Sequence, residues 1–391
     1  MENFTFCSPT NFVFGKGTEE KVGELCSKYG AKKILIVYGG GSVVRSGLLD
    51  RVKDSLTKAG LVYTELGGVK PNPEDDKVRE GIKMVREEGI DFLLPVGGGS
   101  TIDTAKGIAC GALYDGDFWD FYVGKSVIQK AMPVGVVLTI PAAGSEGSGN
   151  SVITNISTMQ KLSLRCPDHL RPVFSIMNPE LTFTLSPYQT ACGICDMMVH
   201  IFERYFTNSD AVGISDRLCE GILESIMEEA PKVMADPENY DARANLMWAG
   251  NIAHNGTCGI GRIEDWSSHF IEHEISSMYG VTHGAGLSVI FPAWMEFTSK
   301  INPSKAKQLS IRVLGVSPNY LNDDVIALGI NKLREFWKSL GLPVTMHELG
   351  VDNPDIDALV RNLHANKGEI IGNYVPLTKD MTRQILELAN R

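Results

Sequence analysis

The chain has 391 residues, of which 43% are hydrophobic and 21% charged, and its formal net charge is −10. It is long enough for two domains, its composition is that of an ordinary soluble globular protein, and its acidic balance argues against nucleic acid as a partner. No basic region followed by an apolar one opens the sequence and no apolar run is long enough to span a bilayer, so we expect a cytoplasmic protein without membrane attachment.

Short apolar runs alternate with amphipathic segments up to about residue 185. The predicted strands cover 33–38, 61–66, 91–96 and 133–140, and the predicted helices cover 48–56, 75–88 and 101–110. This alternation predicts a mainly parallel sheet with helices on both faces. We therefore expect an α/β domain of Rossmann-like type over residues 1–185.

The strand pattern stops at Ser186. Ser186 and Pro187 suit the N-cap and the first position of a helix. The remainder indicates successive helices, over 187–207, 211–235, 241–255, 265–279, 284–298 and further on. This predicts an all-helical domain over residues 186–391.

Two glycine clusters each follow a predicted strand and precede a helix. They consist of Gly39, Gly40, Gly41 and Ser42, and of Gly97, Gly98, Gly99 and Ser100. Ser100 is expected as the N-cap, with Asp103 as the acid of a capping box. Neither cluster has the full G-x-G-x-x-G pattern, so a plain tight turn remains an alternative to phosphate binding. Their place at the carboxyl ends of parallel strands favours a dinucleotide.

An acid and several histidines stand at helical spacing in apolar surroundings. Asp196 and His200 are four residues apart, as are His269 and His273, and His283 follows a short break. Residues at i and i+4 share one helix face, and a buried aspartate needs a partner. One carboxylate with three imidazoles suits Fe²⁺, Zn²⁺ or another first-row divalent ion. Either His269 or His273 is then left over as the histidine that is not a ligand.

Eight scattered cysteines are expected to be reduced and buried. Cys192 and Cys195 form a C-x-x-C, but no second pair completes a zinc site, so a redox or metal role is the minority interpretation.

Motifs along essentially the whole chain resemble those of the iron-containing (type III) alcohol dehydrogenases. They are KPNP (residues 70–73), GGGSTIDTAKG (97–107), TIPAAGSE (139–146), GICDMMVH (193–200), DWSSHFIEHE (265–274) and THGAGL (282–287). Within that family the sequence is most similar to butanol dehydrogenases and broad-range aldehyde reductases. The resemblance implies a dehydroquinate synthase-like helical domain beside the dinucleotide-binding one, and a homodimer.

The same resemblance assigns roles to residues at matching positions. It implies that Asp196, His200, His269 and His283 bind the metal, with Fe²⁺ expected and Zn²⁺ as the alternative, and that His273 relays a proton. The residues from Gly97 to Ser100 would bind the pyrophosphate, and further cofactor contacts would come from Asn72, Asp103, Thr139, Ser145 and Lys161. Ala143 stands where relatives commonly have threonine, which would forfeit a cofactor hydrogen bond of about 1 kcal/mol.

Position 39 bears on the choice of cofactor. NAD-preferring relatives have an aspartate there, which would repel a 2′-phosphate by roughly 4 kcal/mol at intermediate dielectric. Gly39, Gly40, Gly41 and Ser42 remove that repulsion, so we expect a preference for NADP(H). The general Rossmann rule would instead nominate an acid about twenty residues further on, where Glu65 stands, but the resemblance places the discriminating contact at the earlier turn.

The resulting expectation is hydride transfer between NADP(H) and a short- to medium-chain primary alcohol or aldehyde, with the metal as Lewis acid. A non-redox alternative on the same fold is a dehydroquinate synthase-like lyase. Those enzymes have a glutamate among their metal ligands in place of the Asp-x₃-His pair.

Overall fold

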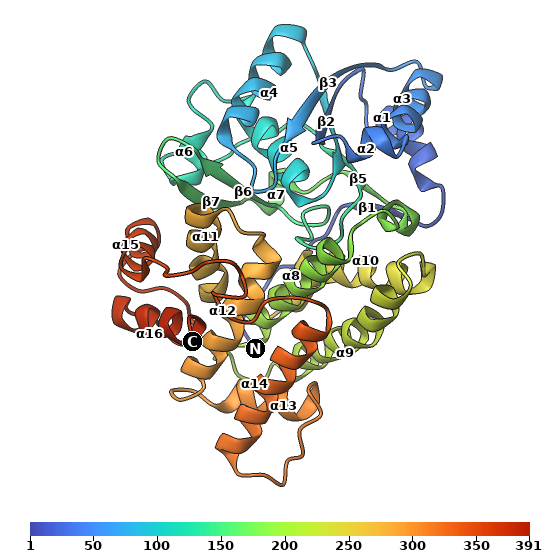
Figure 1. Ribbon diagram of the computed structural model, residues 1–391. Helices are drawn as coiled ribbons and strands as arrows, with labels where there is room; N and C mark the ends of the chain where they lie inside the picture. Colours follow the sequence, from blue (N-terminus) through green and yellow to red (C-terminus); the bar gives the residue numbers. More distant parts are fainter. The chain divides into compact units, whose positions relative to one another are not determined.

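The computed structural model describes residues 1–391, which form two compact units. One unit comprises residues 7–184, and the other comprises residues 185–391 together with residues 1–6. The ribbon in Figure 1 shows strands in the first unit, coloured blue to green, and helices throughout the second, coloured green to red.

The first unit is built on a six-stranded parallel sheet. Its strands are β1 (Asn11–Phe14), β2 (Lys33–Gly39), β3 (Val62–Val69), β4 (Phe92–Gly97), β5 (Gly135–Leu138) and β8 (Phe174–Met177). Their order across the sheet is β1-β8-β5-β4-β2-β3, and every pair in it is parallel. The parallel α/β architecture expected from the sequence is confirmed, and the edge strand β1 and the strand β8 are additions to it.

Helices cover both faces of this sheet. They are α1 (Val22–Lys28), α2 (Ser42–Arg45), α3 (Leu48–Lys58), α4 (Asp75–Glu88), α5 (Gly99–Gly111), α6 (Trp119–Tyr122) and α7 (Pro167–Leu170). Ile34 and Ile36 of β2 share a buried cluster with apolar residues of α1 and α3. Since side chains alternate along a strand, Leu35 and Val37 serve the other face, where α5 packs on β2 and β4.

A two-stranded antiparallel hairpin was not anticipated from the sequence. Strand β6 (Asn150–Asn155) pairs with β7 (Gln160–Arg165), with Asn150 opposite Arg165 and Asn155 opposite Gln160. The side chain of Asn155 accepts hydrogen bonds from the backbone of Ser157 and Thr158, which closes the turn. An Asn-initiated turn between two alternating segments is the sequence signal that identifies it.

The second unit is helical. Its helices are α8 (Pro187–Tyr205), α9 (Gly213–Ala235), α10 (Tyr240–His254), α11 (Ser267–Tyr279), α12 (His283–Thr298), α13 (Ser304–Arg312), α14 (Asn322–Ser339), α15 (Ile356–Lys367) and α16 (Lys379–Ala389). Helix α8 begins as expected, because Ser186 and Gln189 form a capping box and Pro187 holds the first position. Almost all of α8 is buried, and it packs against α9, α10 and α12. No helix has both the length and the apolar character needed to cross a membrane.

The N-terminal residues belong to the helical unit and not to the sheet unit, contrary to the expected boundary. The backbone N–H of Glu2 donates to the carbonyl of Gly261 at 2.9 Å, and Ser209 Oγ donates to the carboxylate of Glu2 at 2.8 Å. These bonds fix the start of the chain on the segments that follow α8 and α10.

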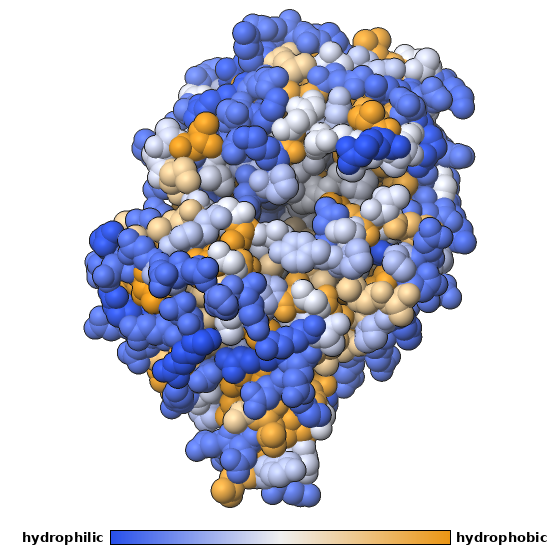
Figure 2. Space-filling model, in the orientation of Figure 1, coloured by the Kyte–Doolittle hydropathy of each residue, from blue (hydrophilic) through white to orange (hydrophobic).

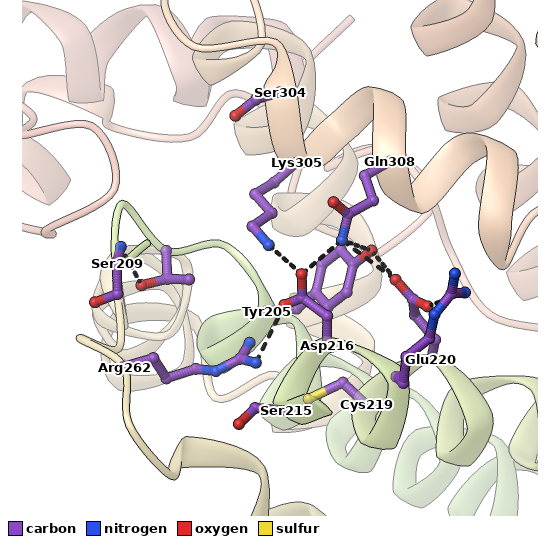
Figure 3. Close-up of polar contacts among 12 residues, drawn as sticks. Tyr205, Ser209, Ser215, Asp216, Cys219, Glu220, Arg262, Ser304, Lys305 and Gln308 are labelled. Carbon is purple, nitrogen blue, oxygen red and sulfur yellow. Dashed lines mark hydrogen bonds and ion pairs between the residues drawn. The ribbon is translucent and has the colours of Figure 1, made fainter. Parts of the chain in front are cut away.

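A buried ionic network joins α9 to α13 and to the loop before α11. Asp216 accepts hydrogen bonds from Arg262, Lys305 and Gln308 at 3.1, 2.6 and 2.8 Å, and Glu220 accepts one from Tyr205 at 2.7 Å (Figure 3). A polar depression of about 440 Å³ beside this network is lined by residues 207–213, Asp216, Ser304, Lys305, Gln308 and Arg312. None of the predicted metal ligands lines it.

The face shown in Figure 2 is largely hydrophilic, and its hydrophobic residues appear in small separate groups. Of the eight cysteines, Cys7 is exposed and Cys166 half-buried, contrary to the expectation that all are buried, and all eight are free thiols.

Candidate metal centre and dinucleotide-binding edge

Four side chains converge inside the helical unit. Asp196 and His200 lie one turn apart on α8, His269 lies on α11, and His283 is the first residue of α12. The Nε2 atoms of the three histidines lie 3.6, 3.9 and 3.7 Å, in that order, from Oδ1 of Asp196. The structure thus brings together all four residues proposed as ligands, and it places His269 and not His273 against the aspartate.

Two of the donor atoms in this cluster have no hydrogen-bond partner. Asp196 Oδ1 and His269 Nε2 are buried and make no hydrogen bond. Burying a charged carboxylate without a compensating partner costs roughly 3–5 kcal/mol of stability. A cation among one carboxylate oxygen and three imidazole nitrogens removes that penalty, and this donor set fits a first-row divalent metal.

Two further carboxylates hold the histidines in place. His269 Nδ1 lies 2.8 Å from Glu203 Oε1, and His283 Nδ1 bonds to Glu272 Oε2. Both glutamates are buried. With Nδ1 bonded to a carboxylate, Nε2 is the ring nitrogen that faces the cluster, as is usual for metal-binding histidines.

Sequence reasoning missed both glutamates, although the spacing contained the signal. Glu203 follows Asp196 by two helical turns on α8, and Glu272 lies between His269 and His273 on α11. Residues two turns apart share a helix face, so a second acid at that spacing marks a partner for the same centre.

The histidines of the cluster differ in their affinity for protons. Burial, and then the neighbouring His254 and His269, hold the pKa of His200 well below its usual range. Burial also disfavours charge on His269, but Asp196 and Glu203 outweigh it and raise the pKa of His269 to about 9. A cation that binds here therefore displaces a proton from His269 at neutral pH.

His273 lies beside this centre but in a different group of donors. It is buried on α11, and its ring centroid lies 5.4 Å from that of His283 and 6.3 Å from that of His269. Donor atoms of Glu272, His273 and His283 lie within 4.8 Å of one another. His273 is therefore the histidine left over from the cluster around Asp196.

Two aromatic side chains that sequence reasoning did not single out line the same centre. The ring of His254, the last residue of α10, lies 4.3 Å from that of His200. The ring centroid of Trp266 lies 5.1 Å from that of His269, and Trp266 Nε1 donates a hydrogen bond to Glu264. The backbone of Trp266 is left-handed, with a φ of 73°. His254 stands at no helical spacing from a predicted ligand, whereas Trp266 precedes His269 by three residues.

In the sheet unit, the two glycine clusters end neighbouring strands. Tyr38 at the end of β2 is paired with Val96 of β4, so the turns after Gly39 and Gly97 are adjacent. The connection from β2 leads to β3 on one side, and β4 continues to β5 on the other. This is the topological switch point at which open α/β sheets bind nucleotides.

The start of α5 differs from the expectation. Helix α5 begins at Gly99 with Gly98 as N-cap, so Ser100 is not the cap and Asp103 is not a capping acid. No side chain caps this end, which leaves its first backbone N–H groups for an anion. A Cβ on Gly99 would lie 2.9 Å from that of Ala143, because the helix start packs closely on the segment after β5.

Asp103 and Ser145, both expected at the cofactor, are buried and bond to each other. Ser145 Oγ donates to Asp103 Oδ1 at 2.6 Å, and the backbone N–H of Val152 donates to the other carboxylate oxygen at 2.9 Å. The ammonium group of Lys106 donates to Ser145 and to the carbonyls of Ser148 and Asn150, between 2.6 and 2.8 Å. Burial lowers the pKa of Lys106 to about 8, against the opposing effect of Asp103.

Other predicted cofactor residues are also placed near one another. Lys161 Nζ donates to Asn72 Oδ1 at 2.9 Å, and Asn72 has a left-handed backbone with φ of 54°. The backbone N–H of Thr139 donates to the carbonyl of Gly97 at 3.0 Å, which holds the segment after β5 beside the second glycine cluster.

The acid that the general Rossmann rule nominates is already engaged. Lys53 Nζ lies 2.7 Å from Glu65 Oε1. Burial and then the neighbouring carboxylate of Glu65 raise the pKa of Tyr38. The turn from Gly39 to Ser42 contains no acid.

Comparison with known families decides the assignment. Residues 9–179 match the model described as "Iron-containing alcohol dehydrogenase", and residues 190–390 match "Fe-containing alcohol dehydrogenase family, C-terminal". The chain belongs to the iron-containing alcohol dehydrogenase family. This iron-containing alcohol dehydrogenase is accordingly a metal-dependent oxidoreductase of alcohols and aldehydes that uses a nicotinamide cofactor, and the lyase alternative is not favoured.

Full-length relatives divide over the cofactor in their names. The Bacillus subtilis protein named "Probable NADH-dependent butanol dehydrogenase 1" is 43% identical over 99% of each chain. The NADPH-dependent aldehyde reductase YqhD of Escherichia coli is 37% identical over the full length of both. The crystal structure of NADH-dependent butanol dehydrogenase A from Thermotoga maritima matches with a TM-score of 0.96 and 41% identity, covering 100% of this chain and 99% of that one.

Proposed function

We propose that this enzyme transfers a hydride between NADP(H) and short- to medium-chain primary alcohols and aldehydes of the butanol and butanal type, with bound Fe²⁺. The observation that carries the proposal is the convergence of three histidine nitrogens on the unpaired Oδ1 of Asp196. Relatives named for butanol and for aldehyde reduction, at 37–43% identity, support the substrate class.

Asp196, His200, His269 and His283 would hold the metal. A bound divalent ion supplies Lewis acidity, which stabilises negative charge on the substrate oxygen. The family description supports Fe²⁺, and Zn²⁺ is the alternative that the same donor set accepts. Glu203 and Glu272 fix the rings of His269 and His283, so both Nε2 atoms stay aimed at one point.

His273 is proposed as the proton relay for the alcohol. It is a buried imidazole that does not join the cluster around Asp196, and its ring centroid lies 5.4 Å from that of His283, so it is near enough to the centre to exchange a proton with a substrate there. Replacing it by glutamine should lower kcat while leaving bound metal at one ion per chain. Unchanged kcat in that variant would remove His273 from the reaction.

Residues 7–184 are proposed to bind the dinucleotide and residues 185–391 the metal. The segment from Gly97 to Ser100, which leads from β4 into α5, suits the pyrophosphate, because the N-terminal N–H groups of α5 lack a side-chain cap. The remaining proposed contacts come from Gly39, Gly40, Gly41, Ser42, Asn72, Thr139 and Lys161, while Asp103 and Ser145 shape the loop from within.

NADP(H) is proposed over NAD(H). The turn after β2 carries no acid, and Glu65 is neutralised by Lys53, so no free carboxylate is available to bond a ribose 2′-hydroxyl or repel a 2′-phosphate. The E. coli aldehyde reductase named for NADPH supports this choice, whereas the butanol dehydrogenases named for NADH oppose it.

A homodimer in the cytoplasm is proposed for the assembly. Strand β1 is the edge of the parallel sheet, and Phe14 at its end is 39% exposed, so the edge offers backbone and apolar surface for pairing with a second copy. Light scattering coupled to gel filtration measures this directly. A mass of one chain would contradict the dimer.

The reaction is tested by following NADPH absorbance with butanal on protein loaded anaerobically with Fe²⁺, with NADH in parallel. Rapid oxidation of NADPH and slow oxidation of NADH is the expected result. Preference for NADH would overturn the cofactor choice alone. No oxidation of either cofactor with butanal or a panel of other aldehydes would overturn the proposed reaction.

A further inference from the structure

One arginine stands free beside the glycine turn that follows β2. Arg45 is the last residue of α2, and its backbone N–H donates to the carbonyl of Gly41 at 3.0 Å. Its side chain folds back over the turn, because a Cβ on Gly41 would lie 3.4 Å from Arg45 Nη1. The label α2 in Figure 1 marks this position in the sheet unit.

The side chain of Arg45 is exposed and makes no hydrogen bond or ion pair within the protein. The other cations along this edge are already engaged with acids. Lys53 pairs with Glu65, Lys70 with Glu74 and Lys77 with Glu80, each at 2.7 Å. Arg45 therefore supplies the uncommitted positive charge at the carboxyl end of β2.

We infer that Arg45 binds the 2′-phosphate of NADP(H) and is a residue that sets the cofactor preference of this enzyme. In a doubly wound α/β fold the adenosine ribose lies at the end of this strand, and an arginine nearby accommodates the extra phosphate of NADP. A guanidinium can bond a phosphate through two N–H groups at once, whereas a ribose hydroxyl offers it no matching charge. The inference rests on the preference for NADP(H) under Proposed function.

The same geometry explains why a glycine turn is compatible with this role. Gly41 has a φ of 104°, which L side chains rarely adopt, and any side chain there would approach the guanidinium of Arg45. The bare turn keeps the space beside Nη1 open. Ser42, the next residue along the chain, is also exposed and carries a hydroxyl donor.

The inference is tested with two fragments of the cofactor, adenosine 2′,5′-bisphosphate and AMP, whose affinities are measured by calorimetry on the purified full chain. The unmodified protein should bind the bisphosphate more tightly. Arg45→Gln should weaken binding of the bisphosphate by roughly 10-fold to 100-fold, the size of a charge-assisted contact, and leave that of AMP unchanged. Arg45→Lys should retain part of the affinity.

A matched control is Arg51→Gln. Arg51 is an arginine on α3, 43% exposed, which pairs with Glu19 at 3.4 Å instead of facing the turn. This variant should bind both fragments as the unmodified protein does. In turnover, Arg45→Gln should raise KM for NADPH and leave KM for NADH and both kcat values in place.

The outcomes separate the inference from the proposal beneath it. If the unmodified protein prefers the bisphosphate and Arg45→Gln weakens both fragments equally, or neither, Arg45 is not the phosphate ligand and the cofactor preference stands. If the unmodified protein binds the two fragments equally, the preference for NADP(H) and the inference both fail.

Discussion

Nε2 of His283, at the start of α12, lies 3.7 Å from Oδ1 of Asp196, in the middle of α8. The two residues are remote in the sequence, and only packing of α12 on α8 brings them together. Gly284 permits this approach, since a Cβ there would lie 2.1 Å from the carbonyl oxygen of Cys192. A metal site built across two helices in this way depends on the fold of the whole helical unit.

Removing the charge of Glu203 should weaken the metal centre. In Glu203→Gln the negative charge behind His269 Nδ1 is lost although an acceptor oxygen remains, and metal affinity should fall about 10-fold to 100-fold. The affinity is measured by competition with a chromogenic chelator. Glu224→Gln, an exposed glutamate on α9, is the control and should bind metal normally. Equal affinities in the two variants would show that Glu203 does not support the centre.

A negative charge at position 39 should reverse the cofactor preference. Gly39→Asp places a carboxylate where the 2′-phosphate is proposed, at a cost of about 4 kcal/mol at close range and intermediate dielectric. A Cβ there lies 3.3 Å from the carbonyl oxygen of Val69, so the strand end yields slightly. Gly39→Ala provides the same Cβ without the charge and should keep the preference. The ratio of kcat/KM for NADPH and NADH is the measurement, and an unchanged ratio in Gly39→Asp argues against this placement of the ribose.

Lys106 should be essential to the stability of the sheet unit. Its ammonium group is completely buried and bonds to Ser145, Ser148 and Asn150, with Asp103 nearby. Lys106→Met leaves those carbonyls and the carboxylate without their cation. The free energy of unfolding, measured by urea denaturation, should fall by about 3–5 kcal/mol. Lys130→Met, at an exposed lysine, should change it by less than about 0.5 kcal/mol. A similar small change in both variants would mean that water replaces the lysine.

Thiol chemistry should distinguish Cys7 from the buried cysteines. Burial raises the pKa values of Cys26, Cys110 and Cys192 to about 12 each. Iodoacetamide reacts with the thiolate and not with the thiol. At pH 8 a thiol with a pKa of about 12 is ionised in on the order of one molecule in ten thousand. Iodoacetamide on the native protein should therefore label exposed Cys7 first. Raising the pH to 9 should not make the three buried thiols reactive. Peptide mass mapping reads this out, and rapid labelling of Cys192 would contradict the structure around α8.

The sequence predicted the helices and the central strands because their periodicity is local. The range 75–88 coincides with α4, and 186–187 marks the start of α8. Strands β1 and β8 are short and have no alternating pattern, so their pairing depends on long-range contacts. The capping of α5 was predicted wrongly, because Asp103 is drawn inside by Ser145 and Val152 rather than toward the helix end.

For the site, spacing identified Asp196, His200 and the histidines of α11, but it left open which of His269 and His273 joins the aspartate. That choice depends on the rotation of α11 against α8, which Glu203 fixes by bonding to His269. His254 and Arg45 could not be singled out, because their importance comes from what lies beside them in space. His254 of α10 packs edge to face against His200. Arg45 differs from its neighbours only because their charges are paired and its charge is not.

A divalent metal bound by Asp196 and the three histidines is expected to enable hydride transfer. The most direct measurement is an anaerobic titration of metal-free protein with Fe²⁺, with NADPH oxidation by butanal as the readout, for the unmodified chain and for Asp196→Asn. Activity should rise in proportion to Fe²⁺, level off at one ion per chain, and stay near zero in the variant. Full activity before any Fe²⁺ is added, or an equal rise in Asp196→Asn, would show that hydride transfer does not depend on a metal at this site.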